Sequence, residues 1–228
     1  MTDGSEPAPD VALDLKRYAR IGLDEALLCG GKTDEQIITI LDIVASNLVS
    51  MLLTRLEPNV VEAFPEHHRR RLDYDPLSRT GWYGEIAPAR PTIDVAIVTG
   101  GTSDLRVARE SGRTLRYYGH QALEINDVGV AGLWRLLERI PELRRVRVVI
   151  AVAGMDAAIV SVLGGLLGNV VIAVPTSTGY GVAHQGETAL AASLASCASG
   201  VVVVNIDNGY GAACAAIRLL NSFGGRLT

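Results

Sequence analysis

Five apolar runs, each followed by a stretch with helical character, constrain the fold of this chain more than any other feature. The predicted strands cover residues 94–99, 121–126, 146–153, 170–174 and 200–206. The predicted helices cover residues 103–118, 130–140, 155–167, 186–197 and 210–222. Continuous apolar runs suit strands buried on both faces, and short strand–helix–strand connections favour parallel pairing. The sequence therefore predicts an α/β fold in which helices cover both faces of a parallel sheet.

Polar residues and glycines gather just after these predicted strands. The segments concerned are residues 100–104, 126–129, 153–156, 175–181 and 205–209. All of them contain glycine, and four contain an acidic residue. Because ligands of parallel sheets bind outside the carboxyl ends of the strands, this edge is the predicted functional site.

The first segment, in the sequence DVAIVTGGTSD, has features of an anion site. Gly100 and Gly101 allow a sharp turn and a close approach of the backbone to a ligand. Thr102 or Ser103 can cap the next helix, whose free amides attract anions. The segment matches neither G-x-G-x-x-G nor G-x-x-x-x-G-K-[ST], so an ordinary strand–helix turn is the alternative.

Composition argues against several functional classes. The chain has 228 residues, 48% of them hydrophobic, and a net charge of −4, so neither a nucleic-acid partner nor a membrane partner is expected. The longest apolar run is interrupted by Arg147, Asp156 and glycines, and the acidic start MTDGSEPAPD is the reverse of a signal peptide. Three cysteines without metal-ligand spacing indicate free thiols in a cytoplasmic protein.

The N-terminal part is predicted to consist of a tail, a helical region and a linker. Residues 1–9 are expected to form a disordered tail, and residues 10–57 a helical region with a capping box at Thr33–Gln36. That helix is expected to end near Leu56. Residues 58–92 are charged, aperiodic and dotted with proline, which predicts a linker that covers a ligand. His67 and His68 stand beside three arginines and indicate a solvated patch rather than a metal site.

The segments quoted next resemble the LarB family, which opens synthesis of the nickel-pincer nucleotide cofactor. They are TGGTSDLRVARE, INDVGVAGLWRLL, VVIAVAGMDAAIVSVLGGL, VIAVPTSTGYG, GETAL and SCASGVVVVNIDNGYGA, with LDLKRYARIG, GKTDEQI and LLTR nearer the N-terminus. Residues 93–228 are also similar to PurE-type aminoimidazole ribonucleotide carboxylases. The resemblance implies a three-layer, flavodoxin-like or PurE-like catalytic domain in that region.

The resemblance implies a reaction as well. LarB-like enzymes carboxylate the pyridinium ring of nicotinic acid adenine dinucleotide, using CO₂ or bicarbonate, and hydrolyse its phosphoanhydride. The products are pyridinium-3,5-biscarboxylic acid mononucleotide and AMP. The resemblance leaves open a requirement for Mg²⁺, and it implies no bound nickel and a homo-octamer whose sites are completed by neighbouring chains. A Gly/Ala-rich segment such as GMDAAIVSVLGGLLG permits the close packing that an oligomer needs.

The resemblance places the nucleophile at Cys197, in SLASCASG, and the acid–base carboxylate at Asp156, in AGMDAA, where the family more often has glutamate. A thiolate that adds to the ring makes it nucleophilic, and cysteine suits such reversible addition. Helix-dipole reasoning alone favours Cys214, in the first turns of the last helix, over Cys197 near a helix end. Cys29 is expected to be structural.

The remaining candidates are expected to bind substrate. They are Gly101, Thr102, Ser103, Asp104, Asp127, Gly129, Gly154, Thr176, Ser177, Thr178, Tyr180, Asp207 and Asn208. Thr102, Ser103 and Asp104 are expected to hold phosphate and ribose, with a metal as an alternative for Asp104. Asp127 suits ribose, Mg²⁺ or a helix cap, and Tyr180 can stack on the ring. Asn208 precedes glycine and can serve only a backbone turn.

Two other functions fit parts of the pattern. A PurE-type carboxylase or mutase is one, but its histidine-containing SAHR segment is replaced by INDVGVAG. The other is a non-catalytic, nucleotide-sensing module on the same scaffold, because fold alone does not fix function.

Overall fold

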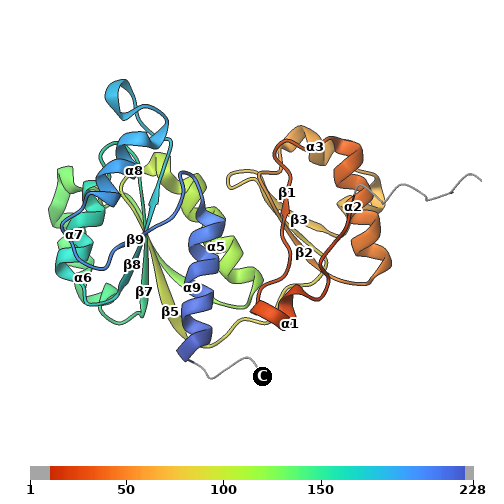
Figure 1. The fold of residues 1–228 in the computed structure, drawn as a ribbon, viewed down its shortest axis with the longest axis horizontal. Helices are drawn as coiled ribbons and strands as arrows, with labels where there is room; N and C mark the ends of the chain where they lie inside the picture. The colour runs from red at the N-terminus through yellow and green to blue at the C-terminus, as the bar shows by residue number, and fades with distance from the viewer. Residues whose placement is uncertain (1–10, 224–228) are drawn as a thin grey trace, which may run out of the picture.

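In a computed structural model, the chain forms two units that lie side by side (Figure 1). The structure describes residues 11–223, so the tail expected at residues 1–9 lies outside the described part. Within that part, no helix is long and apolar enough to cross a membrane.

The C-terminal unit is a sheet of five parallel strands in the order β6-β5-β7-β8-β9. Its elements are β5 (Ile93–Thr99), η1 (Thr102–Asp104), α5 (Leu105–Tyr117), β6 (Gln121–Ile125), η2 (Val130–Gly132), α6 (Leu133–Leu143), β7 (Val148–Ala153), α7 (Ala158–Leu166), β8 (Val170–Pro175), η3 (Gly181–Gly186), α8 (Glu187–Leu194), β9 (Val202–Val203) and α9 (Gly209–Phe223). The predicted α/β fold with a parallel sheet is confirmed. The last strand is shorter than expected, because β9 is an edge strand that pairs only with Ile172 and Ala173.

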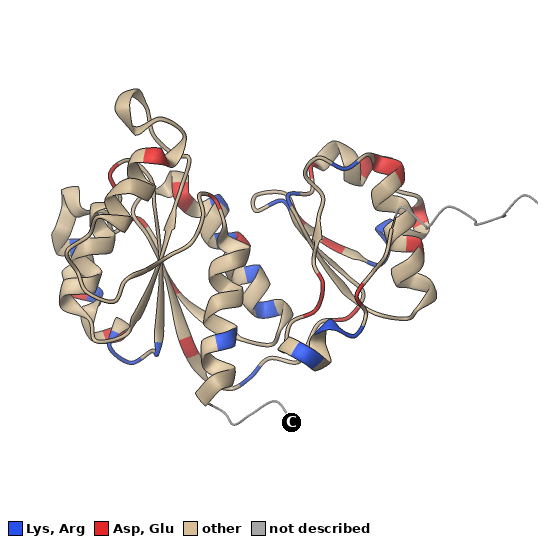
Figure 2. Cartoon of the chain, viewed as in Figure 1, with Lys and Arg blue, Asp and Glu red and all other residues tan. Residues whose placement is uncertain are grey.

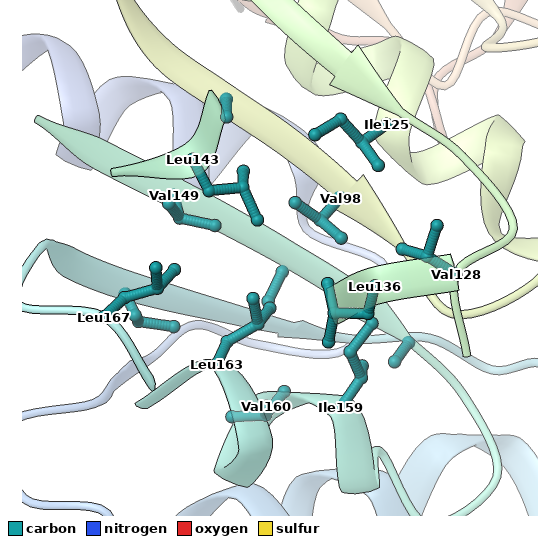
Figure 3. Close-up of a cluster of buried hydrophobic side chains, with 14 of the residues drawn as sticks. Val98, Ile125, Val128, Leu136, Leu143, Val149, Ile159, Val160, Leu163 and Leu167 are labelled. Atoms are coloured by element: carbon teal, nitrogen blue, oxygen red, sulfur yellow. The ribbon is translucent and has the colours of Figure 1, made fainter. Parts of the chain in front are cut away.

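Alternating side chains of the central strands feed two separate cores. Val98 of β5 belongs to a buried cluster with Leu136 of α6 and Leu163 of α7 (Figure 3). Its neighbour Ile97 belongs to the cluster on the opposite face, with Val107 of α5. Both faces of the strands are therefore buried, which explains why they read as continuous apolar runs.

The N-terminal unit is not the helical region and linker that the sequence predicted. It contains a four-stranded sheet in the order β1-β2-β4-β3. Its elements are α1 (Arg17–Ile21), β1 (Leu27–Leu28), α2 (Asp34–Ser46), β2 (Met51–Thr54), α3 (Pro58–Ala63), α4 (Glu66–Arg69), β3 (Leu72–Asp75) and β4 (Thr80–Tyr83). Strands of two to four residues are too short to show a periodic pattern, which is why residues 58–92 looked like a linker.

The long helix predicted from Thr33 to near Leu56 is also divided. The capping box at Thr33 and Gln36 is present, but the helix stops at Ser46. Leu48 then adopts a left-handed backbone with φ of 54°, which turns the chain into β2. Met51 and Leu52, whose spacing continues the pattern of the predicted helix, belong to the buried strand β2 instead.

His68 is not part of a solvated patch. Its side chain is fully buried, and its Nδ1 lies 2.7 Å from the hydroxyl of Tyr83. Its Nε2 lies 3.0 Å from Oδ1 of Asp42. Tertiary packing of α4 against β4 decides this position, which the sequence of charges around it does not indicate.

Arginines of α5 join the two units, along the helix where Figure 2 shows several basic residues. Arg113 stacks 3.8 Å above the ring of Trp82 and donates from Nε to Thr80 Oγ1 at 2.7 Å. One turn earlier, Arg109 pairs with Asp75 at 2.9 Å. These contacts fix the N-terminal unit against the helix that begins at the predicted functional edge.

Candidate active site

The loops that follow β5, β6, β7 and β8 surround a pocket of about 260 Å³ at the carboxyl edge of the sheet. The residues lining it include the predicted Gly101, Ser103, Asp104, Gly129, Gly154, Asp156 and Thr178. Segments distant in sequence therefore meet at the edge where ligands of parallel sheets bind. The wall is formed largely of glycine and alanine, and its polar side chains are those of Ser103, Thr178, Asp104 and Asp156.

Asp104 holds the anion loop in shape. Its carboxylate is buried, and its Oδ2 accepts the backbone N–H of Gly101 at 2.9 Å. Its Oδ1 accepts the hydroxyl of Thr176 at 2.7 Å. Burial raises the pKa of the Asp104 carboxyl, and these hydrogen bonds offset part of that rise. The side chains of Asp104 and Thr176 therefore stabilise the conformation of the loop, and their hydrogen bonds are made to the protein itself.

Two glycines allow the loops to approach closely. A Cβ on Gly154 would lie 2.2 Å from the carbonyl oxygen of Thr178, and one on Gly129 would lie 2.5 Å from that of Gly100. Such distances exclude any side chain at Gly154 or Gly129 without movement of the neighbouring backbone.

Backbone strain gathers at the same edge. The left-handed region is occupied by Asp127 after β6, Met155 and Ala157 after β7, and Asp207 after β9. Non-glycine residues in this region cost free energy and persist where the surrounding structure imposes them, often at functional sites. Strain at three of the five strand ends supports the assignment of this edge.

Asp156 is the exposed carboxylate of the pocket lining. Within the described part of the chain, the one hydrogen bond that its Oδ1 accepts is long, 3.3 Å, from the amide of Ala158 at the start of α7. Ser103, just before α5 begins, is also exposed and lines the same pocket. Helix α5 has 13 residues, so its first turn presents the positive end of a helix dipole beside Ser103. An acid–base group and an anion-binding end thus face the same pocket.

Asp127 is held outside the pocket lining. Its carboxylate pairs with Arg135 of α6 at 2.7 Å, and its amide donates to Thr99 Oγ1 at 2.9 Å. Within residues 11–223 its side chain makes no hydrogen bond that caps a helix, and the ribose contact stays a prediction.

Residues after β8 and β9 form a neighbouring cluster. Asp207 accepts from the amide of Ser177 at 2.9 Å and from its hydroxyl at 2.7 Å. Asp207 also pairs with Arg106 of α5 at 2.8 Å. Asn208 accepts the amide of Gly211, so its side chain caps α9, the turn role that the sequence left open. Tyr180 is 78% exposed and is not among the residues that line the pocket.

The three cysteines lie in different environments. Cys29 and Cys214 are held among apolar side chains, and burial raises their thiol pKa values to about 12 and about 11. Cys214 therefore lacks the thiolate character that its place in the last helix suggested, because desolvation outweighs the helix dipole. Cys197 is exposed. It follows α8, next to Ser196, whose hydroxyl lies 2.7 Å from that of Ser161 in α7.

Cys197 and Asp156 do not line the same pocket. Cys197 is absent from the residues that line the pocket, whereas Asp156 is among them. The remaining predicted residue, Thr102, is exposed in the 3₁₀ turn that opens α5.

Two residues that the sequence did not single out belong to this edge. Arg106 lies in the first turn of α5 and pairs with Asp207. Glu110, one turn later, is buried with Oε2 lacking a partner among the described residues. Burial raises the pKa of Glu110 to about 7. Their i, i+4 spacing is visible in the sequence and is typical of a surface pair, whereas the burial of Glu110 beneath α9 depends on tertiary packing.

Comparison with known proteins identifies the family of this chain. A model described as AIR carboxylase matches residues 94–227, and one described as LarB/PurE-like N-terminal domain matches residues 8–85. The chain belongs to the LarB family. The match to the AIR carboxylase model makes this a carboxylase-type family. All residues that line the pocket lie in the part that this model matches.

Relatives of this LarB-family protein include an uncharacterized protein, MJ0165 of Methanocaldococcus jannaschii. It is 37% identical over 213 residues, which cover 88% of this chain and 80% of that protein. Among solved structures, a PurE2 variant of Treponema denticola is 20% identical, with a TM-score of 0.47 and coverage of 57% of this chain and 80% of that one.

Proposed function

We propose that this LarB-family chain is a pyridinium-3,5-biscarboxylic acid mononucleotide synthase. It carboxylates the pyridinium ring of nicotinic acid adenine dinucleotide and hydrolyses the phosphoanhydride, which releases AMP. The observation that carries the proposal is the single pocket that both the start of α5 and the exposed carboxylate of Asp156 line.

The pocket has parts suited to a pyridinium mononucleotide. The helix start at Thr102 and Ser103 favours the phosphate, because its dipole and backbone amides attract an anion. The small side chains of Ala131, Ala157 and Ala158 leave a low-polarity wall for a flat ring. CO₂ is an apolar molecule that such a wall admits, with bicarbonate as its hydrated source.

The proposed chemistry is covalent. The thiolate of Cys197 adds to ring position 4, which removes the aromaticity and makes position 5 nucleophilic. Position 5 attacks the carbon of CO₂, and Asp156 removes the proton from that position. Expulsion of the thiolate restores the aromatic ring. Water then cleaves the phosphoanhydride, and the two products are the dicarboxylated mononucleotide and AMP.

The location of Cys197 makes a second copy of the chain part of this proposal. Since Cys197 is exposed but outside the pocket lining of its own protomer, a neighbouring chain has to bring it to the ring. Exposed apolar side chains in η3 and α8, which precede Cys197 in the chain, support such an assembly; they include Val182 at 93% and Leu194 at 67%. The expected assembly is a homo-octamer.

No preformed Mg²⁺ site is found at the pocket among residues 11–223. The Asp104 oxygens are engaged by Gly101 and Thr176, and Asp127 pairs with Arg135. The proposed mechanism therefore routes no step through Mg²⁺, and any such ion would arrive with the substrate's phosphates.

Mass spectrometry of the products tests the function directly. The purified chain is incubated with nicotinic acid adenine dinucleotide, ¹³C-labelled bicarbonate and Mg²⁺, beside Cys197→Ala and the matched control Cys214→Ala. We expect AMP and a labelled dicarboxylated mononucleotide from the wild type and from Cys214→Ala, and neither from Cys197→Ala. Product from Cys197→Ala would refute the assigned nucleophile. Absence of product from the wild type, with the dinucleotide bound, would refute the synthase.

A further inference from the structure

A second cavity lies between the two units. It measures about 470 Å³, which is within the range of about 300–1,000 Å³ typical of small-molecule sites. The N-terminal unit contributes Gly30, Arg55, Glu57 and Arg79, and the C-terminal unit contributes Arg106 and Asp207. We call these six residues the interdomain cleft. The catalytic steps proposed above use none of them.

The cleft carries an uncompensated positive charge on Arg55. Arg79 pairs with Glu57 at 2.5 Å, and Arg106 pairs with Asp207 at 2.8 Å. Arg55 has neither an ion pair nor a side-chain hydrogen bond with any other residue between 11 and 223. The cleft therefore holds three guanidinium groups and two carboxylates, and each carboxylate is already paired with one of the other two arginines.

Arg55 has a strained backbone conformation, which costs free energy. Arg55 follows β2 in the left-handed region, with φ of 52°. Its side chain passes over Gly30, where a Cβ would lie 3.6 Å from the Cβ of Arg55. A strained backbone that holds an exposed, unpaired arginine is an arrangement found where a ligand uses the side chain.

The region behind the cleft does not neutralise this charge. Glu110 lies close enough to Arg55 and Arg106 for both cations to act on its pKa, yet burial raises that pKa to about 7. Near neutral pH, a substantial share of Glu110 is therefore uncharged. The cleft keeps its preference for an anion.

The cleft adjoins the pocket described above. Asp207 lines the cleft and binds Ser177, whose neighbour Thr178 lines the pocket. Arg106 lines the cleft two residues after Asp104, which lines the pocket. One molecule with two linked halves can therefore occupy both sites along the same edge of the sheet.

We propose that the interdomain cleft binds the phosphate of a nucleoside monophosphate, with Arg55 as its principal ligand. In the proposed reaction, which this inference presupposes, that group is the adenylate half of the dinucleotide and afterwards the AMP product. A guanidinium is suited to this role because its planar fork donates two hydrogen bonds to phosphate oxygens. The N-terminal unit then acts as the holder of the leaving half of the substrate.

Isothermal titration of the full chain with AMP tests the proposal. Arg55→Asn removes the cation, and asparagine tolerates the left-handed backbone at this position, so the fold is expected to persist. The matched control is Arg145→Gln, which removes one exposed positive charge after α6, away from both sites. We expect the affinity of Arg55→Asn for AMP to be at least about tenfold lower than that of the wild type, because a charge-assisted pair is lost. Affinity for AMP should be unchanged in Arg145→Gln.

Three further titrations separate the alternatives. Inorganic phosphate should bind more weakly than AMP, and nicotinic acid mononucleotide should bind wild type and Arg55→Asn equally, since it belongs in the pocket. Equal AMP affinity in wild type and Arg55→Asn, or competition between AMP and nicotinic acid mononucleotide, would overturn the cleft assignment. Phosphate that binds as tightly as AMP would also overturn it, since the nucleoside would then play no part.

The outcome is independent of the carboxylation assay. Arg55-dependent AMP binding without any carboxylated product would leave the cleft in place and refute the proposed function. Carboxylated product with Arg55-independent AMP binding would refute the cleft alone.

Discussion

The hydroxyl of Thr176 donates a 2.7 Å hydrogen bond to Oδ1 of Asp104, although the two residues are 72 positions apart. Both side chains are buried. The bond joins the end of β8 to the turn that opens α5, while the other carboxylate oxygen holds the amide of Gly101. The anion loop thus owes its shape to the strand two positions away in the sheet, as well as to its own residues.

Removal of this hydroxyl tests its importance. Thr176→Val keeps the shape of the side chain but leaves the buried Asp104 without one donor. We expect the free energy of unfolding to fall by about 1–3 kcal/mol, the cost of an unsatisfied buried polar group. Urea denaturation measures the change, and Ser199→Ala, at an exposed position, serves as the control. A variant as stable as the wild type would contradict a structural role for this bond.

Gly154 is expected to tolerate no side chain. The Cβ of Gly154→Ala would lie 2.2 Å from the Thr178 carbonyl oxygen, so the loops after β7 and β8 must separate. We expect a loss of about 1–3 kcal/mol in stability, as for other overpacked sites, and loss of mononucleotide binding. Gly165→Ala, in α7 with open space around it, should be neutral or stabilising. Thermal unfolding and titration of both variants compare them, and equal behaviour would count against the packing argument.

Stability should depend on pH through Glu110. Burial raises its pKa from 4.5 to about 7. Since the folded-state pKa is the higher one, the contribution of protonated Glu110 is complete below the unfolded value and is lost as the pH rises through about 7. The pKa difference corresponds to about 3 kcal/mol. Glu110→Gln should remove this loss.

Urea denaturation of both proteins between about pH 4.5 and 8 measures the effect. Buried His68 and His120 have lowered pKa values, so they contribute stability that is lost as the pH falls. These histidines act equally in wild type and variant, and the difference between the two curves isolates Glu110. Parallel curves would show that Glu110 does not titrate in this range.

The thiols should react in a fixed order. Cys197 is exposed, whereas burial raises the pKa of Cys29 to about 12 and that of Cys214 to about 11. Iodoacetamide at neutral pH should therefore label Cys197 first, because only thiolates react and buried thiols are hard to reach. Peptide mass spectrometry gives the order, with urea-unfolded protein as the control in which all three react. Early labelling of Cys214 would revive it as the nucleophile.

Arg113 should resist replacement even by lysine. Its side chain is 12% exposed, stacks on Trp82 and donates to Thr80. Arg113→Lys keeps the charge but loses the planar guanidinium, and we expect a loss of about 1–2 kcal/mol in stability. Limited proteolysis near residues 84–92 should also become faster, since this side chain fastens the two units together. Arg145→Lys, on an exposed turn, should change neither quantity.

Local patterns were sufficient for the C-terminal unit. Its strands are buried on both faces, so their apolar runs stand out without knowledge of any contact. The capping box at Thr33 and the carboxyl-edge segments around Gly101 and Gly154 were visible for the same reason: each depends on residues close in sequence. The sequence alone thus determined the parallel sheet and the edge that carries the pocket.

Tertiary structure decided what depends on distant partners. Strands of two to four residues are stabilised by neighbours elsewhere in the chain, so β1, β3 and β4 left no periodic signal. Burial raises the pKa of Cys214, which lies on α9, and that of Glu110, which lies on α5. No local sequence pattern indicates this burial. The fold likewise placed Asp156, but not Cys197, in the pocket lining, and it brought the strained Arg55 and Arg106 to the same interdomain cleft. Desolvation and long-range packing act through space, which is why a linear reading could not supply them.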